Sequence, residues 1–113
     1  MQVKKYNKLV RDRVPEICLR NKSIPKTRMA RDDREFIFYL QKKIKEETAE
    51  IIKEKDKEKL KREVANLFEA LDTLLKTLGV SKSEILKARR EKNRERGTFK
   101  KRIILLETKS NLR

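Results

Sequence analysis

The stretch from Leu60 to Leu78 constrains the fold most. Its apolar residues recur every three or four positions, which is the spacing of one helix face and not the alternation of a strand. They are Leu60, Val64, Leu67, Phe68, Leu71, Leu74, Leu75 and Leu78. Asp56 is placed to cap the start of this helix, and Gly79 to end it. The pattern predicts a helix over about 56–78 whose apolar face packs against another helix.

The packing partner is expected just upstream, from about Arg34 to about Glu54. Asp32 or Asp33 can cap this helix, and the connection DKEK, residues 56–59, is short. A short connection favours an antiparallel helical hairpin. The apolar stripe of this upstream helix comprises Phe36, Ile37, Leu40, Ile44 and Ile51.

Shorter elements flank the hairpin. Pro15 stands in the first turn of a short helix, PEICLRN, which ends near Asn21. Ser81 begins a capping-box pattern that opens a third long helix ending at Gly97. Two segments, residues 25–30 and TFKKRIILLE at 98–107, are candidates for a short two-stranded β element near the termini. The expected class is all-α: one domain over residues 1–113, with a helical hairpin plus a third helix.

Composition limits how large a core the chain can build. Only 36% of the 113 residues are hydrophobic and 45% are charged, so we expect oligomerisation to complete a helical bundle. No apolar run approaches the length of a membrane span, and the N-terminus lacks the apolar core of a secretion signal. The single Cys18 suits a reducing compartment. These features predict a cytoplasmic protein with no membrane partner.

The net charge of +15 favours a polyanionic partner, either a nucleotide or a nucleic acid. It does not choose between them, and abundant Lys and Glu are equally typical of a heat-adapted protein with surface ion pairs.

Carboxylates gather in KEETAEII, residues 45–52. At about 100° per residue Glu47 falls inside the apolar stripe of its helix, Glu50 lies at the border, and Glu46 points further out. A carboxylate in an apolar stripe is costly unless it is paired, hydrogen-bonded or bound to metal. Across the predicted hairpin, Glu63 and Asn66 are placed to face these residues.

Converging carboxylates repel unless a divalent cation neutralises them. With no His and one Cys, the sequence argues against zinc and leaves oxygen ligands, which suit Mg²⁺. The chemistry indicated is metal-assisted phosphoanhydride hydrolysis. The alternative is that these carboxylates pair with the plentiful Lys and Arg on solvated helix faces.

Four segments, in order, resemble the MazG-like all-α nucleoside triphosphate pyrophosphohydrolases, in particular their small, single-domain, phosphoribosyl-ATP pyrophosphohydrolase-like branch. EETAE at 46–50 matches an EExxE helix, and EVAN at 63–66 stands where the family has ExxD. YNKLVRDRVPEI at 6–17 and RGTFKKRIIL at 96–105 resemble the opening and closing signatures. EExxE alone is a weak motif, but the four ordered segments cover nearly the whole chain.

The resemblance implies an enzyme, at least dimeric, that hydrolyses a nucleoside triphosphate between the α and β phosphates. The implied ligands of Mg²⁺, or of Mn²⁺ as a substitute, are Glu47, Glu50, Glu63 and Asn66. Glu46 and Glu47 correspond to the catalytic carboxylates, with Glu46 in an outer-shell or water-orienting role. Basic positions for the triphosphate are Lys8, Arg11, Lys92, Arg96 and Arg102.

Asn66 departs from the family pattern, which has Asp at this position. Its side-chain oxygen can bind a metal but lacks a full negative charge. A catalytically impaired nucleotide-binding homologue is therefore one alternative. Another is a basic helical module for RNA or DNA built around residues 87–102. Aromatic residues make up only 5% of the chain, which argues against a platform that stacks single-stranded bases.

Overall fold

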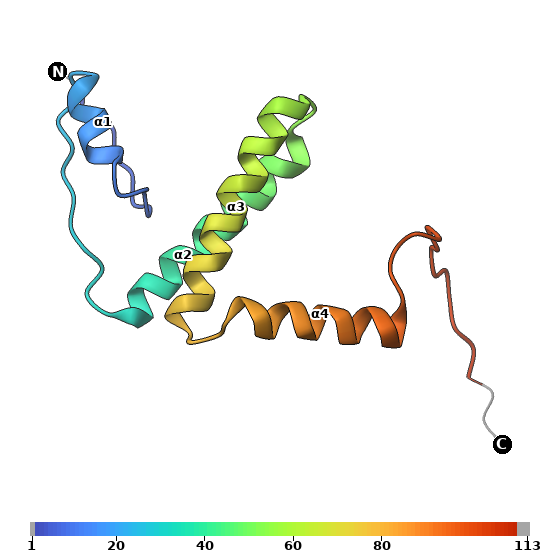
Figure 1. The fold of residues 1–113 in the computed structure, drawn as a ribbon. Helices are drawn as coiled ribbons and strands as arrows, with labels where there is room; N and C mark the ends of the chain where they lie inside the picture. Colours follow the sequence, from blue (N-terminus) through green and yellow to red (C-terminus); the bar gives the residue numbers. More distant parts are fainter. Residues whose placement is uncertain (1, 111–113) are drawn as a thin grey trace. The chain divides into compact units, whose positions relative to one another are not determined.

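The computed structural model describes residues 2–110, and these residues form four helices (Figure 1). The helices are α1 (Val14–Arg20), α2 (Asp33–Lys53), α3 (Lys57–Thr77) and α4 (Lys82–Arg96). The all-α class and the predicted hairpin are confirmed. No strand occurs within residues 2–110, and the two segments 25–30 and 98–107 are non-helical there. Strand pairing and oligomerisation stay predictions.

The helix starts follow from side-chain caps. The backbone N–H of Glu35 donates to Oδ1 of Asp32 at 2.9 Å, so Asp32 rather than Asp33 caps α2. Asp56 caps α3 in the same way, through the backbone N–H of Lys59 at 3.0 Å. At α4 both bonds of the capping box between Ser81 and Glu84 are present. Each cap satisfies a backbone donor that the first helical turn leaves unpaired.

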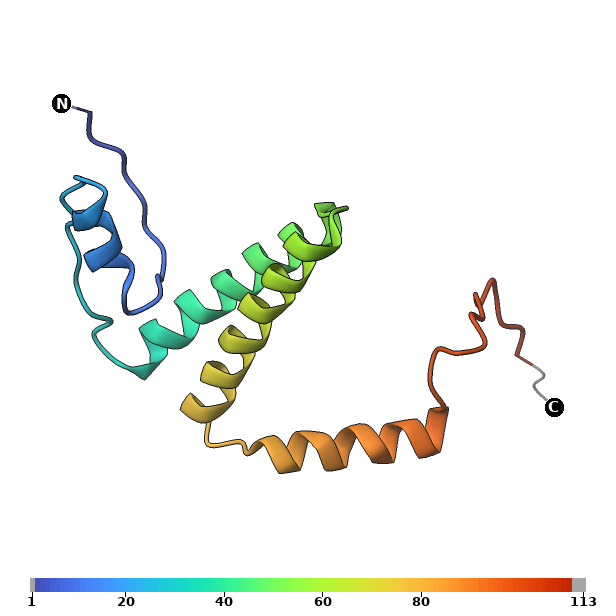
Figure 2. The same cartoon turned by 45° about the horizontal axis from the view of Figure 1, so that its top comes forward.

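Helices α2 and α3 lie side by side as an antiparallel pair, joined by residues 54–56 (Figures 1 and 2). Leu40 of α2 is 2% exposed and Ala70 of α3 is 6% exposed, and they are the buried hydrophobic residues of the described chain. The small side chain of Ala70 leaves room for another helix to approach closely. The buried core of the hairpin is therefore small, and most of its apolar stripe is only half-buried.

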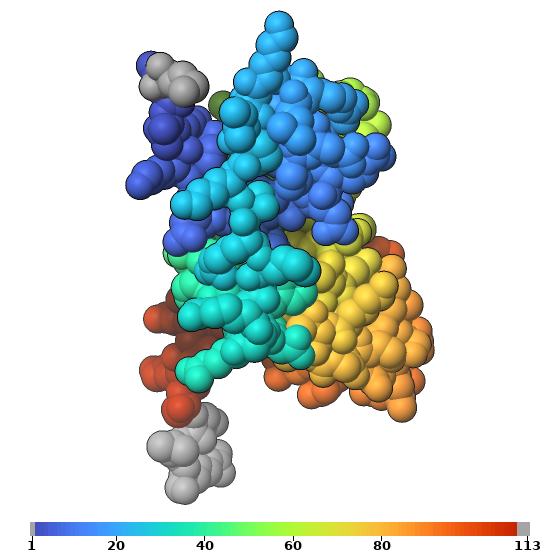
Figure 3. Space-filling view, turned by 90° about the vertical axis from the view of Figure 1, so that its left-hand side faces the viewer, coloured from blue at the N-terminus to red at the C-terminus, as the bar shows by residue number. Residues whose placement is uncertain are grey.

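The chain divides into two compact units, one ending at Val80 and one beginning at Ser81. The first contains α1, α2 and α3, and the connection between α1 and α2 runs over its surface as a ridge, light blue to cyan in Figure 3. The second contains α4 and the residues that follow it. Within the described residues, every helix is either too short or too polar to cross a membrane.

Candidate metal centre

Glu47 is the one charged residue among those described that the fold buries. It lies on α2 and is 6% exposed. Its position inside the apolar stripe, predicted from the helical spacing, is thus confirmed. The nearest cation belongs to Lys43, one turn earlier on the same helix, whose Nζ lies 3.9 Å from Oε1 of Glu47. At this distance the charges attract one another without forming a close hydrogen-bonded pair.

The surroundings of Glu47 raise its pKa above the ordinary value of a glutamate. Burial is the largest cause, and the neighbouring carboxyl of Glu63 adds to it. The Lys43 charge and the neighbouring Asn66 side chain act in the opposite direction. The fold therefore brings Glu47, Glu63 and Asn66 together across the hairpin, as their helical positions predicted.

Asn66 also binds a residue far away in the sequence. Nη2 of Arg11 donates to Oδ1 of Asn66 at 3.0 Å. The oxygen expected to face a metal is thus the acceptor of a guanidinium hydrogen bond. The Asn66 side chain offers both an acceptor and a donor, so it can link the Arg11 cation to the Glu47 carboxyl, and an ionised aspartate has no such donor.

Glu46 lies between two lysines. Nζ of Lys8 is 3.6 Å from Oε1 of Glu46, and Nζ of Lys43 is 3.4 Å from Oε2. Sequence reasoning did not single out Lys43, although it precedes Glu46 by three residues and Glu47 by four, the spacings at which helical side chains meet. Lys43 therefore links the outer carboxylate to the buried one.

The segment before α1 is attached to both helices of the hairpin. The hydroxyl of Tyr39 on α2 donates to Oδ1 of Asn7 at 3.0 Å. Lys8 then pairs with Glu46 of α2, and Arg11 bonds to Asn66 of α3. Two of the predicted triphosphate contacts, Lys8 and Arg11, thus lie at the rim of the acidic group.

Glu50, the remaining predicted metal ligand, is not part of this group. Glu50 lies on α2 one turn after Glu47 and is exposed. Residues 2–110 include no set of three or more acidic, His or Cys side chains close enough to hold a metal ion. Lys92 and Arg96 lie on α4 and Arg102 follows it, all three in the second compact unit. The metal site therefore stays a prediction, with Glu47, Glu63 and Asn66 as its assembled part.

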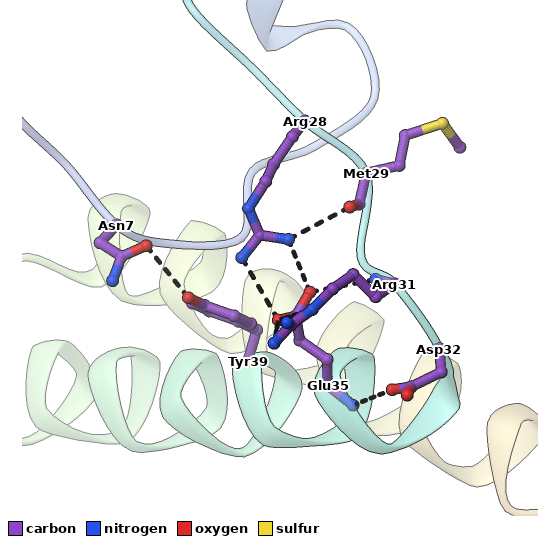
Figure 4. A network of polar contacts seen from close by, with 7 residues as sticks. All are labelled: Asn7, Arg28, Met29, Arg31, Asp32, Glu35 and Tyr39. Carbon is purple, nitrogen blue, oxygen red and sulfur yellow. Dashed lines mark hydrogen bonds and ion pairs between the residues drawn. The ribbon is translucent and has the colours of Figure 1, made fainter.

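A second polar cluster lies at the start of α2, around Glu35 (Figure 4). Nη1 of Arg28 is 2.6 Å from Oε1 of Glu35, and Nη2 of Arg31 is 2.7 Å from Oε2. The backbone N–H of Arg31 donates to the same carboxylate at 3.0 Å. Sequence reasoning missed this cluster, although Arg31 precedes Glu35 by four residues. The cluster attaches the segment that precedes α2 to that helix.

These contacts lower the pKa of Glu35 from 4.5 to about 2, with the Arg28 hydrogen bond as the largest cause. The ionised form therefore stabilises the fold at every pH above about 4.5, and this contribution is lost as the pH falls toward about 2. We expect a Glu35→Gln variant to be less stable than the parent at neutral pH and to approach it near pH 2. Urea unfolding across this pH range measures the difference.

A Glu16→Gln variant is the control for this measurement, because Glu16 pairs with Arg13 on the surface, with side chains 55% and 77% exposed. We expect it to match the parent at each pH. A Glu35→Gln difference that does not depend on pH would contradict the assignment.

The assembled group has two chemical capabilities. Its carboxyl and amide oxygens are of the chemical kind that a hard divalent cation binds, although the described residues include no set of three acidic, His or Cys side chains close enough to hold one. The cations at its rim, Lys8 and Arg11, are suited to bind phosphate oxygens. Similarity to known proteins adds no further assignment, because this chain matches no model of a protein family, no curated protein and no solved structure.

Proposed function

We propose that this protein hydrolyses a nucleoside triphosphate between the α and β phosphates, with Mg²⁺ as cofactor, to give a nucleoside monophosphate and pyrophosphate. The observation that carries the proposal is the buried Glu47, which has Glu63 and Asn66 as neighbours and basic residues at the rim. A carboxyl held near a like charge and away from water is costly for the fold. Such a cost is typical of a site arranged for a cation.

The residues present suit a magnesium ion in kind. Glu47 and Glu63 supply carboxylates from the two helices, Asn66 supplies an amide oxygen, and Glu50 stands one turn from Glu47. Side-chain oxygens of these types are the ligands that Mg²⁺ takes in proteins. When bound, Mg²⁺ or Mn²⁺ would supply charge stabilisation for the phosphoryl oxygens and a more acidic water.

The contacts of the rim residues Lys8 and Arg11 suggest that these cations can bind the substrate. Lys8 and its partner Glu46 have side chains 45% and 40% exposed, and the Arg11–Asn66 bond is also exposed. Exposed pairs of this kind contribute about 0–1 kcal/mol, so they can be exchanged at little cost. We propose that Lys8 and Arg11 turn from these partners to the triphosphate, while the phosphate contacts predicted for Lys92, Arg96 and Arg102 stay predictions from the sequence. Glu46 then becomes free to orient water.

The functional form is proposed to be a homo-oligomer, at least a dimer. The hairpin buries few apolar side chains, while Phe38 and Phe68 remain 50% and 62% exposed. Apolar surface of this kind on a short hairpin is typical of a chain that completes its core with a second copy. Light scattering on the purified protein tests this point, and a monomer at micromolar concentration would contradict it.

The central experiment incubates the purified chain with a panel of nucleoside triphosphates and Mg²⁺ and measures released pyrophosphate. Release that requires Mg²⁺ or Mn²⁺ and disappears with EDTA is the expected result. Release of orthophosphate instead would place the cleavage at another bond. If no triphosphate is cleaved over a range of metals and temperatures, the hydrolase proposal is wrong.

Asn66 favours one alternative, a homologue that binds nucleotides with little or no cleavage. An Asn66→Asp variant distinguishes the two, because it adds a negative charge beside Glu47 and Glu63. If the parent is impaired, we expect Mg²⁺ affinity and pyrophosphate release to rise by about tenfold or more. An Asn66→Ala variant is the control, since it removes the oxygen without adding charge. If Asn66→Asp raises neither pyrophosphate release nor Mg²⁺ affinity, both with Arg11 present and in an Arg11→Gln background, the impaired alternative loses its support.

A further inference from the structure

Helix α4 carries a dense basic surface, and the proposed hydrolysis uses only part of it. None of its residues is buried. Three of them are acidic, namely Glu84, Glu91 and Glu95. Its central and C-terminal part carries six basic residues, Lys87, Arg89, Arg90, Lys92, Arg94 and Arg96.

The two kinds of charge are separated around the helix. At about 100° per residue the three glutamates fall within an arc of about 40°. The six basic residues spread over an arc of about 220° that leaves the glutamates to one side. A helix that is merely solvated commonly mixes opposite charges at i, i+4 spacing over its surface, whereas in α4 Lys87 and Glu91 are the one opposite-charge pair at that spacing. The segregation in α4 therefore gives the helix one acidic edge and a broad basic face.

We propose that α4 binds duplex DNA by lying in the major groove with its basic face against the phosphates, without reading the sequence. The major groove is about 12 Å wide and admits an α-helix. A basic arc wider than half the helix directs cations to both walls of the groove, while the acidic edge faces away from the DNA. Charge complementarity with the phosphates provides the affinity.

Other anionic partners fit α4 less well. A helix that lies on a membrane needs a continuous apolar face, but the large apolar residues Ile85 and Leu86 lie about 100° apart within the basic arc. Single-stranded nucleic acid is held by stacking on aromatic side chains, and α4 has none. The major groove of duplex RNA is too deep and narrow for side chains to reach into.

The test uses the full chain and a fluorescent, mixed-sequence duplex DNA, with anisotropy measured between about 50 and 200 mM salt. In the test variant Arg89, Arg90 and Arg94 are replaced by Gln, a residue compatible with helix. Lys92 and Arg96 stay unchanged because the proposed hydrolysis involves them. We expect affinity to fall more than about tenfold and the salt slope to decrease by about three.

The matched control replaces Lys53, Lys55 and Lys57 by Gln, which removes the same charge from exposed positions around the hairpin connection. We expect this control to bind DNA as the parent does. The DNA proposal is overturned if both triple variants weaken equally, if the parent does not bind at about 50 mM salt, or if it binds phosphatidylserine vesicles or single-stranded RNA more tightly. No nucleotide or Mg²⁺ is present in this titration, so its failure is separate from failure of the hydrolase proposal.

Discussion

Replacing Glu47 with glutamine is expected to reduce Mg²⁺-dependent pyrophosphate release by about 100-fold or more, because loss of a metal ligand costs at least as much as loss of its supporting residues. The same substitution is expected to stabilise the metal-free protein. Glu47 is 6% exposed and lies beside Glu63, so its ionised form is unfavourable there. Glutamine keeps the shape of the side chain and removes the charge.

The pH dependence follows from the raised pKa of Glu47. Below about pH 4.5 the carboxyl is protonated in both the folded and the unfolded chain, and the two proteins should be equally stable. As the pH rises, the Glu47 carboxyl ionises in the unfolded chain before it ionises in the folded chain. The parent protein therefore loses stability, whereas the Glu47→Gln variant keeps it. Urea unfolding in EDTA at acidic and neutral pH measures this effect.

Glu58→Gln is the control for this comparison, since Glu58 is a carboxylate on α3 whose side chain is 72% exposed. It should leave both the hydrolysis and the pH profile unchanged. A Glu47→Gln protein that releases pyrophosphate as fast as the parent would remove Glu47 from the proposed site. A variant that is less stable than the parent at neutral pH would show that the charge is already well compensated.

Leu40→Ala is expected to have the largest effect on stability. Leu40 is 2% exposed and is the largest fully buried side chain of the described chain. Truncating a buried leucine costs about 2–5 kcal/mol, a large part of the roughly 5–15 kcal/mol that stabilises a typical domain. Urea unfolding monitored by circular dichroism measures the loss.

Leu78→Ala is the matched control for this substitution, because Leu78 is 54% exposed. It should cost much less than Leu40→Ala. Equal losses for the two variants would mean that Leu78 is covered in the assembled protein, and they would contradict a core centred on Leu40.

The helices were predictable because their signals are local. The spacing of apolar residues and the caps at Asp32, Asp56 and Ser81 act within one or two turns, and the helices begin where these signals place them. The burial of Glu47 was equally predictable, because its angular position around α2 places it within the apolar stripe of that helix. The hairpin then brings Glu63 and Asn66 to it from α3.

The contacts of the N-terminal segment were not predictable from the sequence. Arg11 and Asn66 are 55 residues apart, and Asn7 and Tyr39 are 32 apart. No periodic pattern predicts which helix face an irregular segment contacts, because the side chains of such a segment do not point in regularly repeating directions. The sequence identified Lys8 and Arg11 only as cations, and their partners Glu46 and Asn66 depend on tertiary packing.

The Arg11–Asn66 hydrogen bond has a consequence for how this chain can evolve. An aspartate at position 66 would pair with Arg11 and lose the amide that acts on Glu47, so the benefit of the new charge depends on the residue at position 11. Positions 11 and 66 are therefore epistatic. A lineage that acquires an aspartate in place of Asn66 is expected to change Arg11 as well, and a double-mutant cycle at these two positions, measured on Mg²⁺ affinity, should give a nonzero coupling energy.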